Sequence, residues 1–517
     1  MKKDCLSNDI HNLRKQLERS KQDLEIKDSL LKNLEKSILY KDKLIIDLQD
    51  AITLLRRKKF GPSSEVSPEQ LTFNELEDIT QDDIEAPEEE SNDEENGKKE
   101  KKKRGKRKKL PEFLPRVDRI IEPDEKDRFD KDGIKLECIG EEVSEQLEII
   151  PAKVQVIRTI RKKYKTPTKK IIIGFLPELL IPKSIASSSL LAHIITAKYV
   201  DGLPLYRQEK VFERIHASLK RQTMARWLIK VSKKLIPLYN LLQDSLLDKV
   251  YIHMDETYTQ ILKEDGKKAT SKSYMWVRCA PCDVNPIILF DYSPSRAGSV
   301  PLELLEGFEG ALQVDGYDGY APAIRELNLK RLGCMDHCRR KFFDASKTSS
   351  GKNIGKKGVR LIDKLYRIEK KIKDFSLEER DRIRKEEAIP LLEEIKKWID
   401  ELRPKITPKS VAGKAISYAY NEWNYLRAYV ENPIYRISNI LVENAIRPFA
   451  IGRKNWLFSD SVDGANASAM FYSLIETAKA NGMEPFDYLN RMLEKLPLAK
   501  TVDDFEKLLP LKGLFQG

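Results

Sequence analysis

The sequence predicts a protein of several units built around an α/β core, and three observations carry this prediction. Between residues 250 and 314, short apolar runs are typical of three strands, a helix and a fourth strand. Residues 352–410 then show dense helical spacing, which predicts a helical insertion before the core resumes near residue 433. An apolar heptad repeat occupies the N-terminal part. A chain of 517 residues is also too long for one hydrophobic core.

The composition favours a globular protein with a polyanionic partner. Apolar residues make up 40% of the chain, and 94 Lys and Arg against 82 Asp and Glu give a net charge of +12. The sequence contains no run of eighteen apolar residues, and its N-terminus is charged, so we expect a cytoplasmic protein without a membrane partner. Six cysteines without a disulfide pattern agree with a reducing compartment.

Residues 1–58 predict a coiled coil of the leucine-zipper kind. Seven first core positions are all apolar: Ile10, Leu17, Leu24, Leu31, Ile38, Ile45 and Ile52. The second core positions are apolar in four of seven cases: Leu13, Ser20, Lys27, Leu34, Lys41, Leu48 and Leu55. Because a strict seven-residue period is typical of coiled coils, we expect a homo-oligomer. A long helix packed within one chain remains the alternative.

Two regions between this helix and the core are less regular. Residues 59–109 predict a flexible linker, acidic at 74–97 and basic at 98–109. The basic run suits a phosphate backbone, although it could equally pair with the acidic run. Residues 110–175 contain short β-like runs at 148–150 and 154–157, which predict a small β-rich module.

Residues 176–249 predict a helical DNA-binding region with a helix-turn-helix. One helix opens after Pro204, a break follows at residues 216–218, and Ser218 is the expected cap of a second helix. In such a motif the second helix enters the major groove. The candidate DNA contacts on that helix are Lys220, Arg221, Gln222 and Arg226. A helical hairpin that binds no DNA is the alternative.

Residues 250–345 predict the first half of the core. Residues 250–254 alternate as in a short strand, which would deliver Asp255 at its exposed end. Strands at 274–277 and 286–290, a helix at 295–307 and a strand at 310–314 that ends in Asp315 follow. This order is how a ribonuclease-H-like fold begins. Since its first and fourth strands are neighbours, Asp255 and Asp315 would share a metal ion. Glu256 would face the opposite side of the strand, and Asp318 lies in a turn.

Residues 346–432 form the predicted insertion, residues 433–495 the second half of the core and residues 496–517 a tail. In the second half, Glu443 and Arg447 share a helix face, and Arg453 with Lys454 offers cations for phosphate. Asp255, Asp315 and Glu443 together would bind Mg²⁺, or Mn²⁺ in its place, for in-line attack on phosphorus. The alternative is three unrelated surface acids.

Several long motifs resemble the transposases of the insertion sequence 66 family. They are residues 60–65 (FGPSSE), 198–201 (KYVD), 203–208 (LPLYRQ), 315–317 (DGY), 333–342 (GCMDHCRRKF), 447–458 (RPFAIGRKNWLF) and 473–482 (SLIETAKANG). The resemblance implies a bacterial, nucleoid-associated DDE transposase whose catalytic triad is Asp255, Asp315 and Glu443. It also implies that element ends and target DNA are bound. Small accessory transposition proteins are common beside transposases of this family and are candidate partners, and the sequence leaves open whether they are required.

The chain departs from the family pattern in two places. The four cysteines of the family's zinc-binding module are replaced by Phe129, Asp132, Thr166 and Lys169, so we expect no zinc there. The lead-in to the third acid is Ser-Asn-Ile at residues 438–440, where relatives often have Asp-Asn-Asn.

A rival metal site would combine Cys279 and Cys282 with Cys334, His337 and Cys338. We do not favour it, because the first two cysteines flank a predicted hairpin turn. His337, together with Arg339 and Arg340, is instead predicted to contact DNA phosphate, and an ordinary hydrogen-bonded His is the alternative. Two other functions remain open: a catalytically inactive DNA-binding remnant or regulator of transposition, and a coiled-coil scaffold that binds nucleic acid passively.

Overall fold

The computed structural model describes residues 2–60, 154–165, 171–173, 178–281 and 284–515. The chain divides into two compact units, one of residues Met1–Asp83 with Glu178–Gly517 and one of residues Ile84–Pro177. In the second unit, strand β1 (Lys163–Lys165) pairs antiparallel with β2 (Ile171–Ile173). The strand predicted at 154–157 is wrong, since these residues are exposed and have no regular structure. The predicted linker from residue 61 onward and the run at 148–150 lie outside the described residues.

Helix α1 (Lys2–Phe60) is one continuous helix that ends where the sequence predicts, before Gly61 and Pro62. The apolar heptad positions with described side chains are half exposed or more: Leu24, Leu31, Leu34, Ile38, Ile45, Leu48, Ile52 and Leu55. They leave an apolar stripe uncovered along α1 in the single chain.

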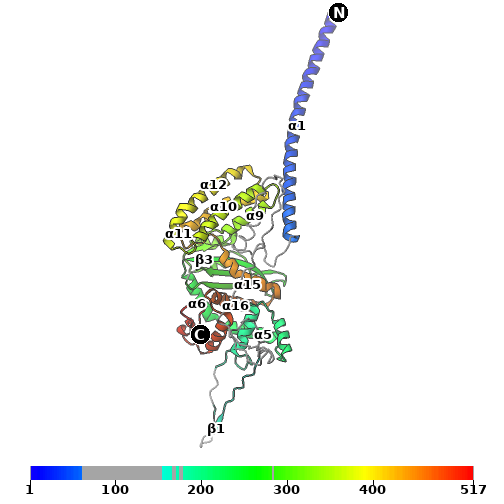
Figure 1. Cartoon of the computed structure of the whole chain (residues 1–517). Helices are drawn as coiled ribbons and strands as arrows, with labels where there is room; N and C mark the ends of the chain where they lie inside the picture. Colours follow the sequence, from blue (N-terminus) through cyan, green and yellow to red (C-terminus); the bar gives the residue numbers. More distant parts are fainter. Residues whose placement is uncertain (1, 61–153, 166–170, 174–177, 282–283, 516–517) are drawn as a thin grey trace, which may run out of the picture. The chain divides into compact units, whose positions relative to one another are not determined.

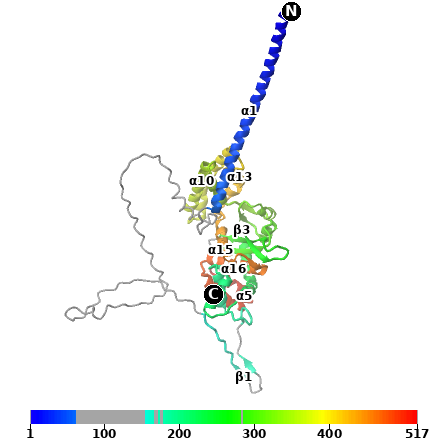
Figure 2. The ribbon, with the colours of Figure 1, turned by 90° about the vertical axis from the view of Figure 1, so that its right-hand side faces the viewer.

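Near its C-terminal end, α1 contacts the turn after helix α9 (Met335–Ser346) and the neighbouring helix α13 (Val411–Asn421) (Figure 2). The buried Asp50 carboxylate accepts the backbone N–H groups of Ser349 and Ser350 at 2.9 and 3.0 Å, and the Ser350 hydroxyl at 2.6 Å. Burial alone would raise the pKa of Asp50, but these hydrogen bonds hold that pKa below its usual value of 3.8.

The core sheet of the described residues contains six strands, five of them in the order β5-β4-β3-β6-β7 and one, β8 (Ser459–Ser461), that pairs with β3 outside this order. The five strands are β3 (Tyr251–Lys263), β4 (Lys272–Ala280), β5 (Ile287–Ser293), β6 (Ala311–Gln313) and β7 (Lys330–Leu332). The first three pair antiparallel, whereas β3, β6 and β7 run parallel. The predicted neighbourhood of the first and fourth strands is therefore confirmed.

Strand β3 is longer than the sequence analysis expects, and this corrects the position of Asp255. The residue lies within the strand, opposite Val277 of β4, and the strand continues to Lys263. On the other edge of β3, β6 pairs only as far as His253, and a short sixth strand, β8 (Ser459–Ser461), begins to pair at Ile261. Within the described residues, the edge of β3 between these two pairings has no partner strand.

The sheet lies between two sets of helices (Figure 1). One set packs in a core with the strands of the antiparallel half: α3 (Ser188–Tyr199), α5 (Arg221–Lys234), α6 (Ile236–Leu247), α15 (Ile440–Trp456), α16 (Val462–Ala480) and α17 (Pro485–Lys495). The other core contains α9, α10 (Lys352–Lys371), α12 (Ile389–Leu402) and α13. Because both faces of β3 are covered, residues 251–254 are all buried, and their alternation does not mark an exposed face.

Shorter helices complete the described fold: α4 (Leu205–Arg214), α7 (Ser299–Leu304), α8 (Ala321–Glu326), α11 (Leu377–Ile383), α14 (Trp423–Arg427) and α18 (Val502–Glu506). Within the described ranges, no helix has both the length and the apolar character needed to cross a membrane. The C-terminal segment is packed, since Leu508, Leu509 and Leu511 are buried in the core that contains α17.

Two glycines of α10 allow it to pack directly on α9. A Cβ atom on Gly355 would lie 2.2 Å from the backbone nitrogen of Ser346, and one on Gly358 would lie 2.4 Å from the ring of Phe342. Only glycine fits at such distances. This contact fixes α9, whose first turn carries His337, against the helices that occupy the predicted insertion.

Candidate active site

Three separate elements bring the predicted acids together. Asp255 lies on β3, Asp315 follows β6, and Glu443 lies in the first turn of α15. Burial raises the pKa of Asp255 well above its usual value, and the carboxylates of Glu256, Glu443 and Asp315 raise this pKa further. The three acids are therefore electrostatic neighbours, although 188 positions separate the first from the last. Asp315 is oriented by its own turn, because its Oδ1 atom accepts the Tyr317 N–H at 2.9 Å.

The start of α15 is fixed to β3 by a buried amide. The Asn439 Oδ1 atom lies 2.8 Å from Nδ1 of His253, and its Nδ2 atom donates to the Met254 carbonyl at 3.2 Å. Burial lowers the pKa of His253 to about 3, so its ring is neutral and donates to Asn439. Glu443 follows one turn later. The sequence analysis does not predict this bridge between β3 and α15, because Asn439 appears there only as part of a departure from the family pattern.

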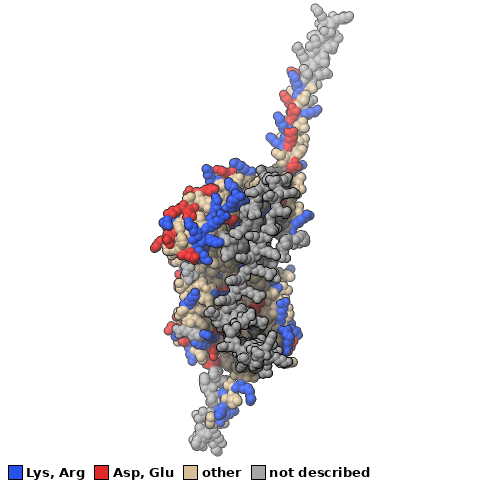
Figure 3. Space-filling view, viewed as in Figure 1, with Lys and Arg blue, Asp and Glu red and all other residues tan. Residues whose placement is uncertain are grey.

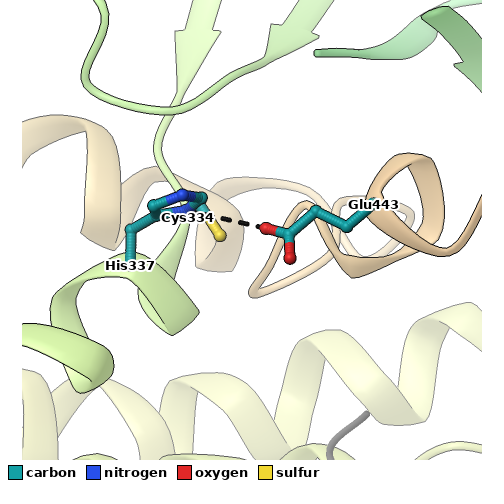
Figure 4. Close-up of side chains that lie close together, drawn as sticks. All are labelled: Cys334, His337 and Glu443. Atoms are coloured by element: carbon teal, nitrogen blue, oxygen red, sulfur yellow. Dashed lines mark ion pairs between the residues drawn. The ribbon is translucent and has the colours of Figure 1, made fainter. Parts of the chain in front are cut away.

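The Glu443 carboxylate faces α9. Its Oε1 atom lies 3.7 Å from His337 Nδ1, and its Oε2 atom lies 3.7 Å from the Arg340 guanidinium. Burial raises the pKa of Glu443, while His337 and Arg340 act in the opposite direction. Cys334 completes the surroundings of this carboxylate (Figure 4). Among the described residues, one trio of candidate metal ligands has ligand atoms all within 4.8 Å of one another, and it is Cys334, His337 and Glu443.

Glu256, the neighbour of Asp255 along the strand, is occupied by structural contacts. Its carboxylate pairs with Arg296 and accepts the Tyr320 hydroxyl. The Arg296 guanidinium lies 3.7 Å from the centre of the Tyr317 ring, and the Tyr317 hydroxyl donates to the Arg296 carbonyl at 2.8 Å. Glu256 thus supports the turn that holds Asp315. Asp318, the other competing acid, is exposed at the start of a short 3₁₀ turn.

The predicted DNA-binding cations near the acids differ in how exposed they are and in whether they already pair with other groups of the protein. Lys454 is exposed, and Arg447 is partly buried. Arg453 ties α15 to β3, because its guanidinium bonds to the Thr257 hydroxyl at 3.1 Å and to the Tyr258 carbonyl. The DNA contact predicted for Arg339 does not fit the structure. That side chain is buried and pairs with Asp363 at 2.6 Å, so its charge is already neutralised.

Helices α4 and α5 form the predicted pair of short helices, with a six-residue connection. The cap predicted at Ser218 is wrong, since α5 begins at Arg221 with Lys220 in the cap position. Lys220 pairs with Glu209 and Glu213 at 3.4 and 3.5 Å. The outer face of α5 exposes the other predicted contacts, which are Arg221, Gln222 and Arg226.

The rival cysteine site does not assemble. Cys279 is buried in the core of the antiparallel strands, whereas Cys338 is buried in the core of the insertion helices. Their thiols therefore belong to different cores. Cys282 lies outside the described residues. His337 lies on the α9 face that meets Glu443.

Comparisons with known proteins give matches along most of the chain. A family model described as "Transposase IS66 family" matches residues 183–467. Further models match residues 47–119 ("Transposase C of IS166 homeodomain"), 131–167 ("zinc-finger binding domain of transposase IS66") and 473–511 ("IS66 C-terminal element").

Two relatives come from Sinorhizobium fredii, and both are described as uncharacterized. Protein y4jD is 31% identical over 415 residues, which cover 78% of this chain and 81% of the relative. Protein y4qI is 30% identical over 411 residues, which cover 77% of this chain and 75% of the relative.

The zinc-finger match corrects the expectation that the chain binds no zinc. The family model matches residues 131–167, which include two of the four substituted cysteine positions, Asp132 and Thr166, and it points to a candidate zinc-binding segment. The physical reason is that zinc accepts carboxylate oxygen as well as thiolate. The segment contains Cys138 and several acids, so the loss of one cysteine set does not exclude zinc. The trio of Cys334, His337 and Glu443 is a second set of suitable ligand types.

Proposed function

The chain belongs to the IS66 family of transposases, as its motifs predict, and we propose that it cuts DNA at the ends of an insertion sequence and joins those ends to a target. The observation that supports the proposal is that the carboxylates of Glu443 and Asp315 lie near enough to Asp255 to raise its pKa. Asp255 lies within β3, Asp315 follows β6, and Glu443 lies in the first turn of α15. Each acid takes the role of a metal ligand.

The donor set fits Mg²⁺, or Mn²⁺ in its place. Both ions prefer carboxylate oxygen, and the pKa of buried Asp255 is raised partly because neighbouring carboxylates repel its charge. A divalent cation would relieve this repulsion. When bound, such an ion would activate a water or a 3′-hydroxyl for attack on phosphorus and would stabilise the oxygen that leaves the phosphorus. The chain itself orients Asp315 through its turn and Glu443 through the Asn439 bridge.

The strand order supports a ribonuclease-H-like core for this chemistry. Three antiparallel strands precede a fourth that lies parallel to the first, and this places the first two acids on neighbouring strands. The helices between α9 and α15 take the place of an insertion between the second and third acids.

DNA contacts are assigned to three surfaces. Helices α4 and α5 act as a helix-turn-helix, with Arg221, Gln222 and Arg226 on the exposed face. Arg340, Arg447 and Lys454 flank the acids and bind the phosphates beside the cleaved bond. Figure 3 shows Lys and Arg side chains, with Asp and Glu side chains among them, over the insertion helices on one face, and we assign the Lys and Arg of this surface to further phosphate contacts.

The exposed apolar stripe of α1 is assigned to self-association as a coiled coil. Two transposase subunits joined in this way would hold two DNA ends in one complex. The stripe has the seven-residue period that such a seam requires.

A strand-transfer assay tests the enzymatic proposal. The substrates are duplexes copied from the DNA that flanks the gene, with a supercoiled plasmid as target and Mg²⁺ present. We expect nicked and joined products with the wild-type protein and none with Asp255→Asn. Equal product from both proteins would reject the triad. No product from either, although both bind the duplexes, would support a DNA-binding regulator instead.

A further inference from the structure

Cys334, His337 and Glu443 form a cluster of side chains that could hold a metal ion. Its ligand atoms lie within 4.8 Å of one another, and His337 Nδ1 is 3.7 Å from Glu443 Oε1 (Figure 4). Ligands that share one tetrahedral zinc ion at about 2.0–2.3 Å lie about 3.4–3.6 Å apart. The His–Glu separation therefore needs a closure of only a few tenths of an ångström.

The facing atoms also lack other partners. Within the described part of the chain, His337 Nδ1 and Glu443 Oε1 are both buried and neither has a hydrogen bond. Buried polar atoms normally have a hydrogen-bond partner. Two buried polar atoms that face each other without one therefore indicate that an ion or ligand binds between them. A cation between them would satisfy both.

Cys334 supplies a sulfur atom as the third ligand. Its sulfur is buried at the start of α9, and the backbone N–H groups of Asn439 and His337 donate to it, the former at 3.3 Å. Burial and the carboxylates of Asp336 and Glu443 nevertheless raise the pKa of this thiol well above its usual value, so the thiol keeps its proton until a cation displaces it. Thiolate and imidazole are ligands for soft or borderline cations, whereas Mg²⁺ prefers oxygen.

We propose that Cys334, His337 and Glu443 bind one thiophilic divalent cation of the Zn²⁺ type, and that this ion competes with the catalytic metal for Glu443. On binding, the Cys334 thiol loses its proton to solvent and sulfur donates the freed electron pair to the cation. The site has three protein ligands and leaves one position for water. Since Glu443 cannot serve both centres in one geometry, zinc would inhibit strand transfer.

The inhibition rests on the proposed function, but the binding site does not. Binding is measured with Co²⁺ in the full-length protein, because a cobalt-bound thiolate gives a charge-transfer absorption that nitrogen and oxygen ligands do not give. The Cys138→Ser background removes the cysteine in the segment that matches the zinc-finger model.

In that background, Cys334→Ser and His337→Ala should each weaken the cobalt affinity at this site by at least about tenfold, as loss of a direct ligand costs no less than loss of an outer-sphere partner. Cys338→Ser is the matched control, since this buried thiol lies four residues away in the insertion core. The site is rejected if the thiolate absorption is the same in the Cys334→Ser and Cys338→Ser proteins. If Cys334→Ser does not fold, an unchanged cobalt affinity in His337→Ala rejects it equally.

Competition is measured as the zinc concentration that halves strand transfer, with each protein compared with its own zinc-free rate. We expect this concentration to rise with added Mg²⁺ in wild type, and to be at least about tenfold higher in His337→Ala. Zinc inhibition that is insensitive to both changes overturns the competition. A protein that shows the cobalt signal but no strand transfer retains the metal site and loses the proposed function.

Discussion

The buried side chains of His253 and Asn439 are joined at 2.8 Å, although 186 positions separate them in the chain. This contact connects the strand that carries Asp255 with the helix that carries Glu443. The neutral His253 ring donates a hydrogen bond to the Asn439 Oδ1 atom, and the Asn439 Nδ2 atom donates to the Met254 carbonyl. The Asn439 amide, together with Arg453 further along α15, therefore helps to fix the relative position of the first and third acids.

Replacing Asn439 with Ala should destabilise the protein and separate these two acids. Loss of a buried hydrogen-bond partner costs about 1–3 kcal/mol, because His253 Nδ1 is left unsatisfied. We expect a lower unfolding temperature and a higher Mg²⁺ concentration for half-maximal strand transfer. A double-mutant cycle with His253→Ala should give a coupling free energy of about 1 kcal/mol or more. Additive effects would show that the two side chains act independently.

Replacing Asp255 with Asn should abolish activity and stabilise the metal-free protein. The amide keeps the shape and the Oδ1 atom that accepts the Glu256 N–H at 2.8 Å, but it removes a buried charge that neighbouring carboxylates repel. In EDTA we expect the unfolding temperature to rise by about one degree, as about 1 kcal/mol would produce in a unit of this size. Strand transfer should fall about 10³-fold or more, because a metal ligand is lost. The measurements are calorimetry and the strand-transfer assay.

If Mg²⁺ raises the unfolding temperature of Asp255→Asn as much as that of wild type, Asp255 is not a metal ligand.

The sequence predicted the succession of three strands, a helix and a fourth strand, and the helix that carries Glu443, because apolar periodicity and long motifs are local signals. The neighbourhood of the first and fourth strands followed from the expected ribonuclease-H-like fold. It did not predict that β3 extends past Asp255, since the strand's length depends on pairing with β4 across the sheet. The burial of Arg339 could not be predicted from the sequence either, because its ion-pair partner Asp363 lies on another helix. The position of Glu443 beside Cys334 and His337 depends on tertiary contacts that no spacing in the sequence encodes.

Replacing Glu256 with Gln should have a smaller effect than replacing Asp255, which tests the choice between the two adjacent acids. Gln can still accept the Tyr320 hydroxyl but loses the charge that pairs with Arg296. The Asp315 turn should loosen, and strand transfer should fall by about tenfold to a hundredfold, since a hydrogen bond to a charged group contributes about 1.5–3 kcal/mol. The stabilisation by Mg²⁺ should remain. If Mg²⁺ no longer stabilises this variant, Glu256 is itself a ligand.

The contact between Asp50 and the turn at Ser349 and Ser350 should depend on pH. The hydrogen bonds hold the pKa of Asp50 below 3.8, so the charged form stabilises the docked α1 helix fully above that pH. This stabilisation is lost as the pH falls through the lower pKa of the docked state. At neutral pH, Asp50→Asn should reduce the hydrogen-exchange protection of the Ser349 and Ser350 amides about tenfold. Asp47→Asn on the same helix is the control, and equal loss in both variants would contradict the assignment.

A charge within the apolar stripe of α1 should dissociate the protein. Ile38 is 57% exposed in the single chain, and its burial between two chains would contribute about 1.5–3 kcal/mol per side chain. Lys at this position would place a charge in the seam, so Ile38→Lys should shift the sedimentation coefficient from that of an oligomer to that of a monomer. Lys36→Glu changes a charge outside the seam and should leave the oligomer intact. Monomeric wild-type protein, or an unchanged oligomer in Ile38→Lys, would assign the stripe to another partner.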